Sequence, residues 1–221
     1  MRFKNICYIY KQLKQQIMKT TLLVLFLALA SCSKNNDTVS PKNSIFSLPP
    51  ETQTGANTFG VTINGKVYIP RDPTGVSVGT TAKGMIFWRS PDDQHTYDEL
   101  EIKDGASSVG FNMTIHLHNL FQIGQGEYLL KQSNFHNGID SIPNNHIYFK
   151  IWDSNINNYA YYGSIENIGS INVTRYDFVN RIFSGKFSGK FVRYDNPNDF
   201  ITINDGRFDI NWNTLQNHPF P

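Results

Sequence analysis

Large apolar side chains alternate with polar or absent ones along most of the chain, and this pattern restricts the fold more than any other feature. In residues 182–192, Phe183, Phe187 and Phe191 share one face with two glycines, and four polar side chains take the other face. Residues 111–118 alternate in the same way. Because a period of two places successive side chains on opposite faces of a β-strand, the chain predicts strands with one buried face.

Other segments extend this pattern. Five further strand candidates are rich in β-branched and aromatic residues and cover residues 85–88, 97–102, 128–130, 146–152 and 171–175. Two hairpins are expected, one around Asn64 and Gly65, and one in which residues 200–203 pair with residues 207–212 across residues 204–206. With no amphipathic helix in the mature domain, we predict an all-β fold, an antiparallel β-sandwich of ten to twelve strands, with a β-barrel as the alternative.

A separate apolar segment lies near the N-terminus. Residues 22–30 are apolar throughout and follow Lys19. A helix that crosses a bilayer needs about 20 apolar residues, so this run is typical of a secretory signal peptide. It ends in Leu-Ala-Ser-Cys, which resembles a bacterial lipobox cleaved between Ser31 and Cys32. The resemblance implies lipid attachment at Cys32; the alternative is an ordinary secretory signal whose cysteine merely lies near the cleavage point.

These features divide the chain into three parts. Residues 1–31 form the signal peptide, within which residues 1–17 are either an extended N-terminal region or a non-native extension upstream of a start at Met18. Residues 32–57 are polar and punctuated by proline, which predicts a flexible linker after the lipidated cysteine. Residues 58–221 form a single β-domain.

Charge and cysteine content exclude several classes of function. The mature chain keeps 15 of the 20 basic residues against all 18 acidic residues, a net charge of −3, so no nucleic-acid partner is expected. Cys7 precedes the cleavage site and Cys32 carries the lipid. The β-domain therefore has no thiol for a disulfide, a thiolate metal site or a nucleophile.

Three patterns are candidates for catalysis or metal binding. Residues 75–79 read Gly-Val-Ser-Val-Gly, the spacing of a hydrolase nucleophile elbow, but the helix that this turn requires does not follow. His116 and His118 share a strand face on which a metal could bind, although no cysteine or acidic partner is evident. Glu99 and Glu101 also share a face, whereas glycoside hydrolases hold two carboxylates about 5–10 Å apart across a cleft.

For these three patterns we expect a loop and two exposed polar strand faces, with no catalytic residue, metal or cofactor. Gly185-Lys186 and Gly189-Lys190 neither begin a helix nor match the P-loop spacing, and they predict no phosphate site. Several aromatic residues could form a stacking platform for sugar rings, although we favour core positions for them. These residues are Trp88, Trp152, Trp212 and the tyrosines of the cluster Tyr159-Ala-Tyr-Tyr162.

Each end of the mature chain carries two motifs. The first part holds Leu48-Pro-Pro-Glu-Thr-Gln-Thr-Gly-Ala-Asn-Thr-Phe-Gly60 and Ile63-Asn-Gly-Lys-Val67, and the last part holds Phe183-Ser-Gly-Lys-Phe187 and Asp205-Gly-Arg-Phe-Asp-Ile210. These motifs resemble the opening and the ending of an uncharacterised family of Bacteroidota lipoproteins. Val61 stands where many relatives have a cysteine, so no role of that thiol transfers. The resemblance implies a lipoprotein of the periplasm or cell surface and no particular activity.

Together these features predict a lipid-anchored cell-envelope protein, in the periplasmic or the surface leaflet of the outer membrane. A binding or structural module is favoured over an enzyme. Its expected partners are the membrane, through N-terminal acyl chains, and a glycan or a protein. Two alternatives stay open. A polysaccharide-directed hydrolase would collect carboxylates from different strands in one pocket, and an accessory subunit of a surface complex would expose one large apolar patch.

Overall fold

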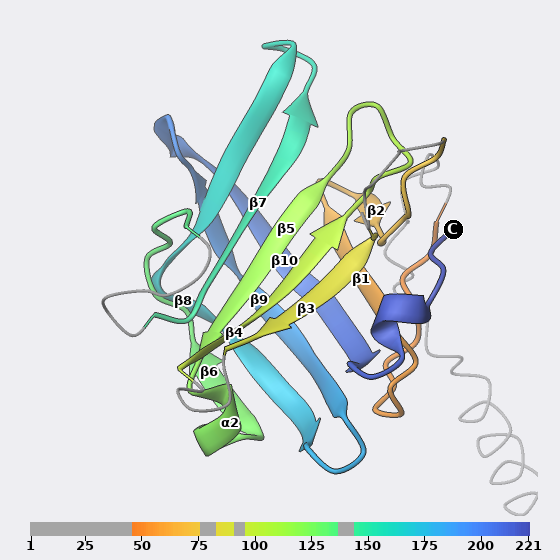
Figure 1. Ribbon diagram of the computed structural model, residues 1–221. Helices are drawn as coiled ribbons and strands as arrows, with labels where there is room; N and C mark the ends of the chain where they lie inside the picture. The colour runs from red at the N-terminus through yellow and green to blue at the C-terminus, as the bar shows by residue number, and fades with distance from the viewer. Residues whose placement is uncertain (1–45, 76–82, 91–95, 137–143) are drawn as a thin grey trace, which may run out of the picture. The chain divides into compact units, whose positions relative to one another are not determined.

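The computed structural model describes residues 46–75, 83–90, 96–136 and 144–221 (Figure 1). The signal peptide, Ser31 and Cys32 lie outside these residues, as do residues 76–79 of the Gly-x-Ser-x-Gly pattern. The elements are β1 (Thr58–Ile63), β2 (Lys66–Tyr68), β3 (Met85–Arg89), β4 (Tyr97–Lys103), β5 (Asn112–His118), α2 (Leu120–Ile123), β6 (Gly126–Leu129), β7 (His146–Asp153), β8 (Asn158–Asp177), β9 (Ile182–Arg193), β10 (Asn196–Asn211) and a 3-10 turn, η1 (Leu215–Asn217). No helix among the described residues is long and apolar enough to cross a membrane.

The ten strands of the described chain form one antiparallel sheet in the order β2-β1-β10-β9-β8-β7-β5-β4-β3, with β6 paired to β8. The sheet folds over so that β3, β4, β5 and β7 cross in front of β8, β9, β10 and β1 (Figure 1). Ring contacts join the two halves, with centroids 5.3 Å apart for both Phe87–Phe183 and Phe149–Phe191. The predicted all-β antiparallel fold is confirmed, and the arrangement is consistent with a sandwich.

The sheet is not a closed barrel. Its edge strands β2 and β3 form no ladder with each other, and β4 is joined to the chain after β2 by a single bridge between Arg71 and Asp104. The side chains of this pair also form a salt bridge, with Arg71 Nε 2.6 Å from Asp104 Oδ1. The barrel alternative is therefore not realised.

The strand pattern predicts the core well. Buried apolar side chains from both halves form one continuous cluster, which includes Phe183, Phe187 and Phe191 of β9 and Met113 and Ile115 of β5. Phenylalanine rings cover glycines on the neighbouring strand: a Cβ on Gly185 would lie 2.6 Å from the ring of its cross-strand partner Phe208. Such ring-over-glycine pairs stabilise a sheet where the glycine alone would leave a gap.

One predicted hairpin is confirmed and the other is wrong. Asn64 and Gly65 have φ of 50° and 75° and join β1 to β2, as the turn chemistry of Asn-Gly requires. The second hairpin does not exist, because β10 runs unbroken through residues 204–206. Ile203 pairs with Gly189 and Gly206 with Phe187, so β10 holds one extra residue there and forms a β-bulge.

The physical reason is that turn-forming residues also suit a bulge, and a single long partner, β9, accepts both halves of β10. A residue of the bulge also joins β10 to β1, since Asp205 Oδ1 accepts a hydrogen bond from the backbone N–H of Thr62, 3.1 Å away. The turn between β9 and β10 falls instead at Tyr194 and Asp195.

The linker expected over residues 32–57 also differs from the structure in its last part. Residues 46–57 have no regular secondary structure, yet they lie against β1 and β9 and make hydrogen bonds to β10 and to Arg175 of β8. We call residues 46–57 the strap. The packed domain thus begins at least a dozen residues before the expected boundary. The boundary was misplaced because a polar, proline-rich composition does not distinguish a free segment from one whose backbone N–H groups donate to buried acceptors.

Candidate ligand-binding groove

Two adjoining cavities lie across β8, β9 and β10, with volumes of about 340 Å³ and 330 Å³. They share Glu51, Lys186 and Arg207, and we call them together the polar groove. Each volume falls within the usual range for ligand sites, about 300–1,000 Å³. Hydroxyl and amide side chains line much of it: Thr52, Gln53, Thr58, Ser170, Asn172, Thr174, Ser188 and Asn204.

The strap forms one wall of the groove, and the buried carboxylate of Asp209 fixes it there. Asp209 accepts hydrogen bonds from the backbone N–H groups of residues 54–56, at 2.8–3.1 Å. The hydroxyls of Thr52 and Ser184 each donate to it at 2.6 Å. With the Thr54 hydroxyl, 3.5 Å from Oδ2, six donors converge on one carboxylate that is only 1% exposed.

These hydrogen bonds also set the charge of Asp209. Burial acts to raise its pKa, but the hydrogen bonds from Ser184, Thr52 and the strap backbone outweigh burial and hold the pKa below its ordinary value. The carboxylate is therefore ionised at neutral pH and makes charge-assisted hydrogen bonds, which are stronger than neutral ones.

Further contacts hold the end of the strap. The Asn57 side chain accepts from the backbone N–H of Asn211 at 2.8 Å and donates to Thr214 Oγ1 at 2.9 Å. Gly55 has φ of +76°, and a Cβ there would lie 2.8 Å from that of Asn211, so both the turn and the close approach require glycine. The wall is thus preorganised.

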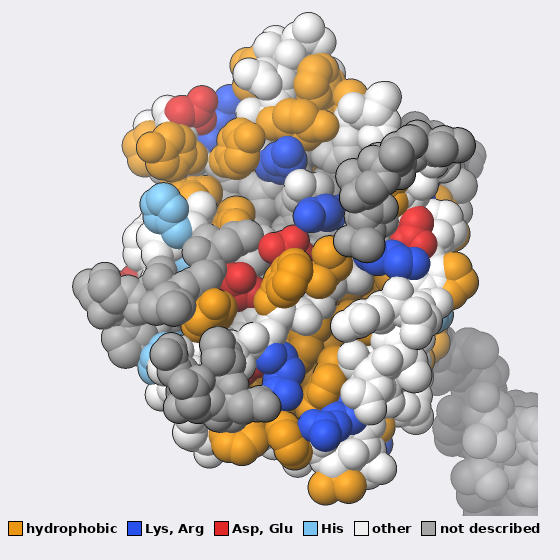
Figure 2. Space-filling view, viewed as in Figure 1, with side chains coloured by type: hydrophobic (Ala, Val, Ile, Leu, Met, Phe, Trp, Pro, Cys, Tyr) orange, Lys and Arg blue, Asp and Glu red, His pale blue; other side chains and the backbone are white. Residues whose placement is uncertain are grey.

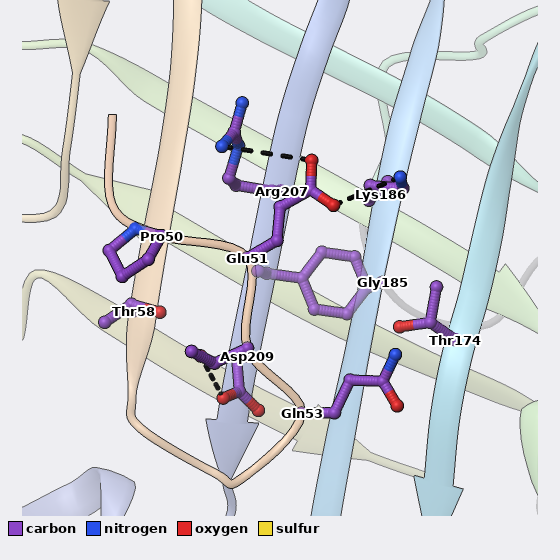
Figure 3. Close-up of a pocket in the computed structure, with 11 residues that line it drawn as sticks. Pro50, Glu51, Gln53, Thr58, Thr174, Gly185, Lys186, Arg207 and Asp209 are labelled. Carbon is purple, nitrogen blue, oxygen red and sulfur yellow. Dashed lines mark hydrogen bonds and ion pairs between the residues drawn. The ribbon is translucent and has the colours of Figure 1, made fainter. Parts of the chain in front are cut away.

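A pair of cations lies where the two cavities adjoin, and Figure 3 shows it beside Glu51. Lys186 and Arg207 are direct cross-strand partners on β9 and β10, an arrangement in which like charges repel. Glu51 of the strap lies between them, with one carboxylate oxygen 3.1 Å from Lys186 Nζ and the other 3.9 Å from Arg207 Nη1. Arg207 Nη1 also donates to the backbone oxygen of Pro49 at 3.3 Å.

The sequence-predicted histidine pair is placed differently. The strand register sets His116 beside His146 of β7, with ring centroids 4.8 Å apart, and beside Glu99 of β4, whose Oε1 lies 2.9 Å from His116 Nδ1. The expectation of exposed polar faces is wrong here, since His116 is 0% and Glu99 4% exposed. Polarity alone does not show whether a strand face meets solvent. No group of three or more His, Cys, Asp or Glu in the described part of the chain is arranged to hold a metal.

The predicted carboxylate pair does not span a cleft. Glu99 and Glu101 are neighbours on β4; Glu99 contacts His116, and Glu101 lies 3.1 Å from Lys103 Nζ. On this face of the molecule, acidic and basic side chains are interspersed (Figure 2). The two carboxylates contact neighbours on the same strand or the next one, Glu99 in a buried position, and they do not face each other as two catalytic groups would.

The aromatic residues do not form one platform. Tyr162 is buried against Phe149, while Trp152 packs edge-to-face on Tyr159 near the β7–β8 turn. Trp88 and Trp212 line a cavity of about 500 Å³ together with Met85, Phe87 and Leu215, which we call the edge cleft because β3 is the edge strand of the sheet. Core positions were expected, and this is wrong for Trp88 and Tyr161, which are 52% and 45% exposed.

Sequence reasoning missed the polar groove. The exposed side of β9 was visible as an alternation of Lys186 and Ser188 with the core residues. The groups that contact Lys186 could not be identified from the sequence. Glu51 lies 135 positions before Lys186, and only the strand register brings Arg207 opposite Lys186. The repeated Gly-Lys was the available signal, and it was set aside for lack of P-loop spacing.

Comparison with known proteins places the chain in a family. A family model described as a domain of unknown function (DUF5025) matches residues 56–211, which contain all of β1 to β10. No curated protein and no solved structure matches the chain. The match covers well over half of the sequence and confirms the expectation of an uncharacterised domain family. The chain therefore belongs to the DUF5025 family.

Proposed function

We propose that the protein is a lipid-anchored binding module of the bacterial cell envelope and that the polar groove is its ligand site. The observation that carries this proposal is the groove itself: hydroxyl and amide side chains from four strands and a fixed strap surround a pair of cations. A ligand rich in hydroxyl groups, such as an envelope or nutrient glycan, suits these donors and acceptors.

The state of the carboxylates favours binding over hydrolysis. Asp209 is ionised and holds the strap. Glu51 contacts the two cations, Glu127 accepts from Ser170 at 2.8 Å, and Asp205 accepts from the backbone of Thr62. A glycoside hydrolase needs two carboxyl groups that face each other across a cleft and reach the glycosidic bond, whereas Asp209 is buried under the strap and the other three carboxylates contact neighbouring groups of the protein.

The anchor in this proposal is Cys32. The apolar run at residues 22–30 and the Leu-Ala-Ser-Cys sequence support lipidation there. Thirteen residues separate Cys32 from the start of the strap at Phe46. The chain from Cys32 to Phe46 reaches at most about 50 Å when fully extended, so the start of the strap would stay within that distance of Cys32.

The ligand site is tested with the mature lipoprotein in non-ionic detergent and a panel of purified bacterial and plant polysaccharides. We expect one class to bind and the double variant N172A/S188A to bind it at least tenfold more weakly. Thr202 is an exposed residue of β10 outside the groove, so T202A is the matched control and should bind as the wild type does. Equal losses in both variants would contradict the assignment of the groove.

The anchor is tested separately by fractionation and mass spectrometry. We expect the wild-type protein in the membrane fraction with acyl chains on Cys32, and C32A in the soluble envelope fraction. An unmodified thiol at Cys32, or membrane association of C32A, would contradict lipid anchoring.

A second candidate, a subunit of a surface complex, is favoured by the edge cleft. The backbone N–H of Ser90 donates to β4, and the backbone C=O of Gly84 accepts from it. Successive residues of a strand direct their backbone N–H and C=O to alternate sides, so those of Phe87 point away from β4, toward the open edge of β3. An open strand edge beside exposed Trp88 suits an added β-strand from a partner protein. A partner that co-purifies with the wild type and T202A, but not with W88A, would support this role.

A further inference from the structure

The cation pair in the polar groove requires an anion. Lys186 and Arg207 face each other across β9 and β10, and within the described residues the anion that reaches both of them is Glu51. The contact is open to solvent, since the side chains of Lys186 and Glu51 are 50% and 51% exposed. An exposed ion pair of this kind contributes little net stability.

The strap does not depend on Glu51. Its backbone is held by the Asp209 carboxylate and its end by the Asn57 side chain, and neither set of contacts involves the glutamate. The Glu51 side chain is therefore free to leave the cations while the wall of the groove stays in place. Its departure would leave a guanidinium and an ammonium group side by side, which together fit one carboxylate.

Resting on the function proposed above, we propose that the groove binds a saccharide that carries a carboxylate, a uronic acid residue, and that this carboxylate replaces Glu51 between Lys186 and Arg207. The exchange of one carboxylate for another leaves the charge balance of the groove unchanged. Asn172 of β8 and Ser188 of β9 lie on the same face and can bond sugar hydroxyls, and Ser170, whose hydroxyl donates to Glu127, can still accept from them.

The rest of the groove restricts where the acidic sugar lies. Glu127 and Asp205 line only the cavity that extends beyond the cations, away from Thr58 and Asp209. Carboxylates accept hydrogen bonds from sugar hydroxyls and repel a second carboxylate. The groove thus suits a uronic acid flanked by a neutral sugar, and not a polymer in which every residue is a uronic acid.

Glu51 then acts as an internal competitor. A site that is occupied by its own side chain for part of the time binds a ligand more weakly in proportion to that fraction. From the range measured for exposed ion pairs, removal of the competitor should tighten uronide binding by about twofold to fivefold. Binding of a neutral glycoside should not change.

The test measures dissociation constants for small probes by saturation-transfer difference NMR on the mature lipoprotein in detergent. The probes are the methyl glycosides of glucuronic, galacturonic and mannuronic acid, the matching neutral glucoside, galactoside and mannoside, and acetate. We expect at least one uronide to bind at least tenfold more tightly than its neutral counterpart and than acetate. E51Q should tighten that binding twofold to fivefold and E51D, with its shorter reach, by less.

Two lysine variants separate the groove from general charge. K186Q should weaken uronide binding at least fivefold. Lys190 lies on the same strand face but packs over the ring of Phe200, 3.4 Å from its centroid, outside the groove, so K190Q should have no effect. Equal effects of K186Q and K190Q would overturn the proposal, as would a loss of uronide binding in E51Q with its unfolding midpoint unchanged.

The remaining outcomes are distinct for the two proposals. If uronides and neutral glycosides bind equally, the acidic specificity is refuted while the sugar-binding function stands. If acetate binds as tightly as the uronides, the saccharide part is refuted. If no glycoside binds, this inference is refuted, and the polysaccharide panel alone decides the proposed function.

Discussion

Replacement of Asp209 by asparagine tests whether one carboxylate holds the strap to the sheet. Asp209 Oδ1 accepts from Gly55 N–H and Ser184 Oγ, and Oδ2 accepts from the backbone N–H groups of Thr54 and Ala56. An amide keeps one oxygen and replaces the other by an NH₂ group, which cannot accept these bonds. The less costly orientation of the substituted amide keeps its oxygen near the N–H groups of Thr54 and Ala56. The Gly55 N–H then faces the amide NH₂ group, which cannot accept its hydrogen bond.

The cost follows from these contacts. A buried donor left without an acceptor costs about 1–3 kcal/mol, and the remaining bonds lose their charge assistance, about 1 kcal/mol each. Because such effects are not additive, we expect D209N to lower the free energy of unfolding by about 3–5 kcal/mol. That is a large fraction of the ~5–15 kcal/mol typical of a domain.

The assay is equilibrium unfolding in urea, followed by tryptophan fluorescence. D205N is the matched control: Asp205 lies four residues earlier on β10 and accepts from the Thr62 N–H through Oδ1, which an asparagine retains. Its expected cost is below about 1 kcal/mol. Similar costs for the two variants, or a cost below 1 kcal/mol for D209N, would refute the role assigned to Asp209.

The same reasoning predicts a pH dependence. The folded-state pKa of Asp209 is lowered, so its stabilisation is complete above the unfolded-state value near 4 and is lost as pH falls through the folded-state pKa. The slope of unfolding free energy against pH below pH 4 should therefore be smaller in D209N than in the wild type. Equal slopes in the two proteins would count against the assignment.

Two further predictions concern the core. Burial, opposed by Arg89, raises the pKa of Asp98 to about 7. The free energy of unfolding should therefore fall as pH rises from 4 to 7, by at most about 4 kcal/mol. D98N should remove most of that fall, as measured by urea titrations at pH 5 and 8. A Cβ on Gly206 would overlap the Phe187 ring, so G206A should lower the unfolding free energy by about 1–3 kcal/mol in the same assay. An unchanged pH profile in D98N, or a neutral G206A, would contradict these two accounts.

The sequence pattern was sufficient for the strands and insufficient for their partners. Phe183, Phe187 and Phe191 could be assigned to the core because a period of two specifies which side chains share a face. The Asn64-Gly65 turn could be assigned because its residues tolerate positive φ. Both inferences use only neighbours along the chain.

The errors share a cause. Asn204-Asp205-Gly206 was interpreted as a turn, although a bulge uses the same residues when one long strand pairs with both flanks. The strap was interpreted as a linker because its main acceptor, Asp209, lies more than 150 positions away. In each case the deciding partner lies on another strand, and register is a property of the assembled sheet.

Three segments of the chain converge on the polar groove. Residues 48–60, 183–187 and 205–210 are distant in the sequence and meet along its strap wall and its floor. The fastening of the strap explains part of each segment, since Thr52, Gly55 and Ser184 all donate to Asp209. It does not explain Glu51, Lys186 and Arg207, which come from the same three segments and line the open cavity.

A purely structural role would be served equally well by shorter or uncharged side chains at these three positions, because exposed ion pairs add little stability. A ligand-binding role accounts for both sets of residues. The buried hydrogen bonds to Asp209 hold the strap wall in place, and Glu51, Lys186 and Arg207 present their charges to a ligand in the groove. The two roles are separable by experiment: D209N should unfold more easily, whereas E51Q and K186Q should change ligand affinity with little change in the urea midpoint. A large loss of stability in E51Q or K186Q would instead assign all three segments to the fastening of the strap.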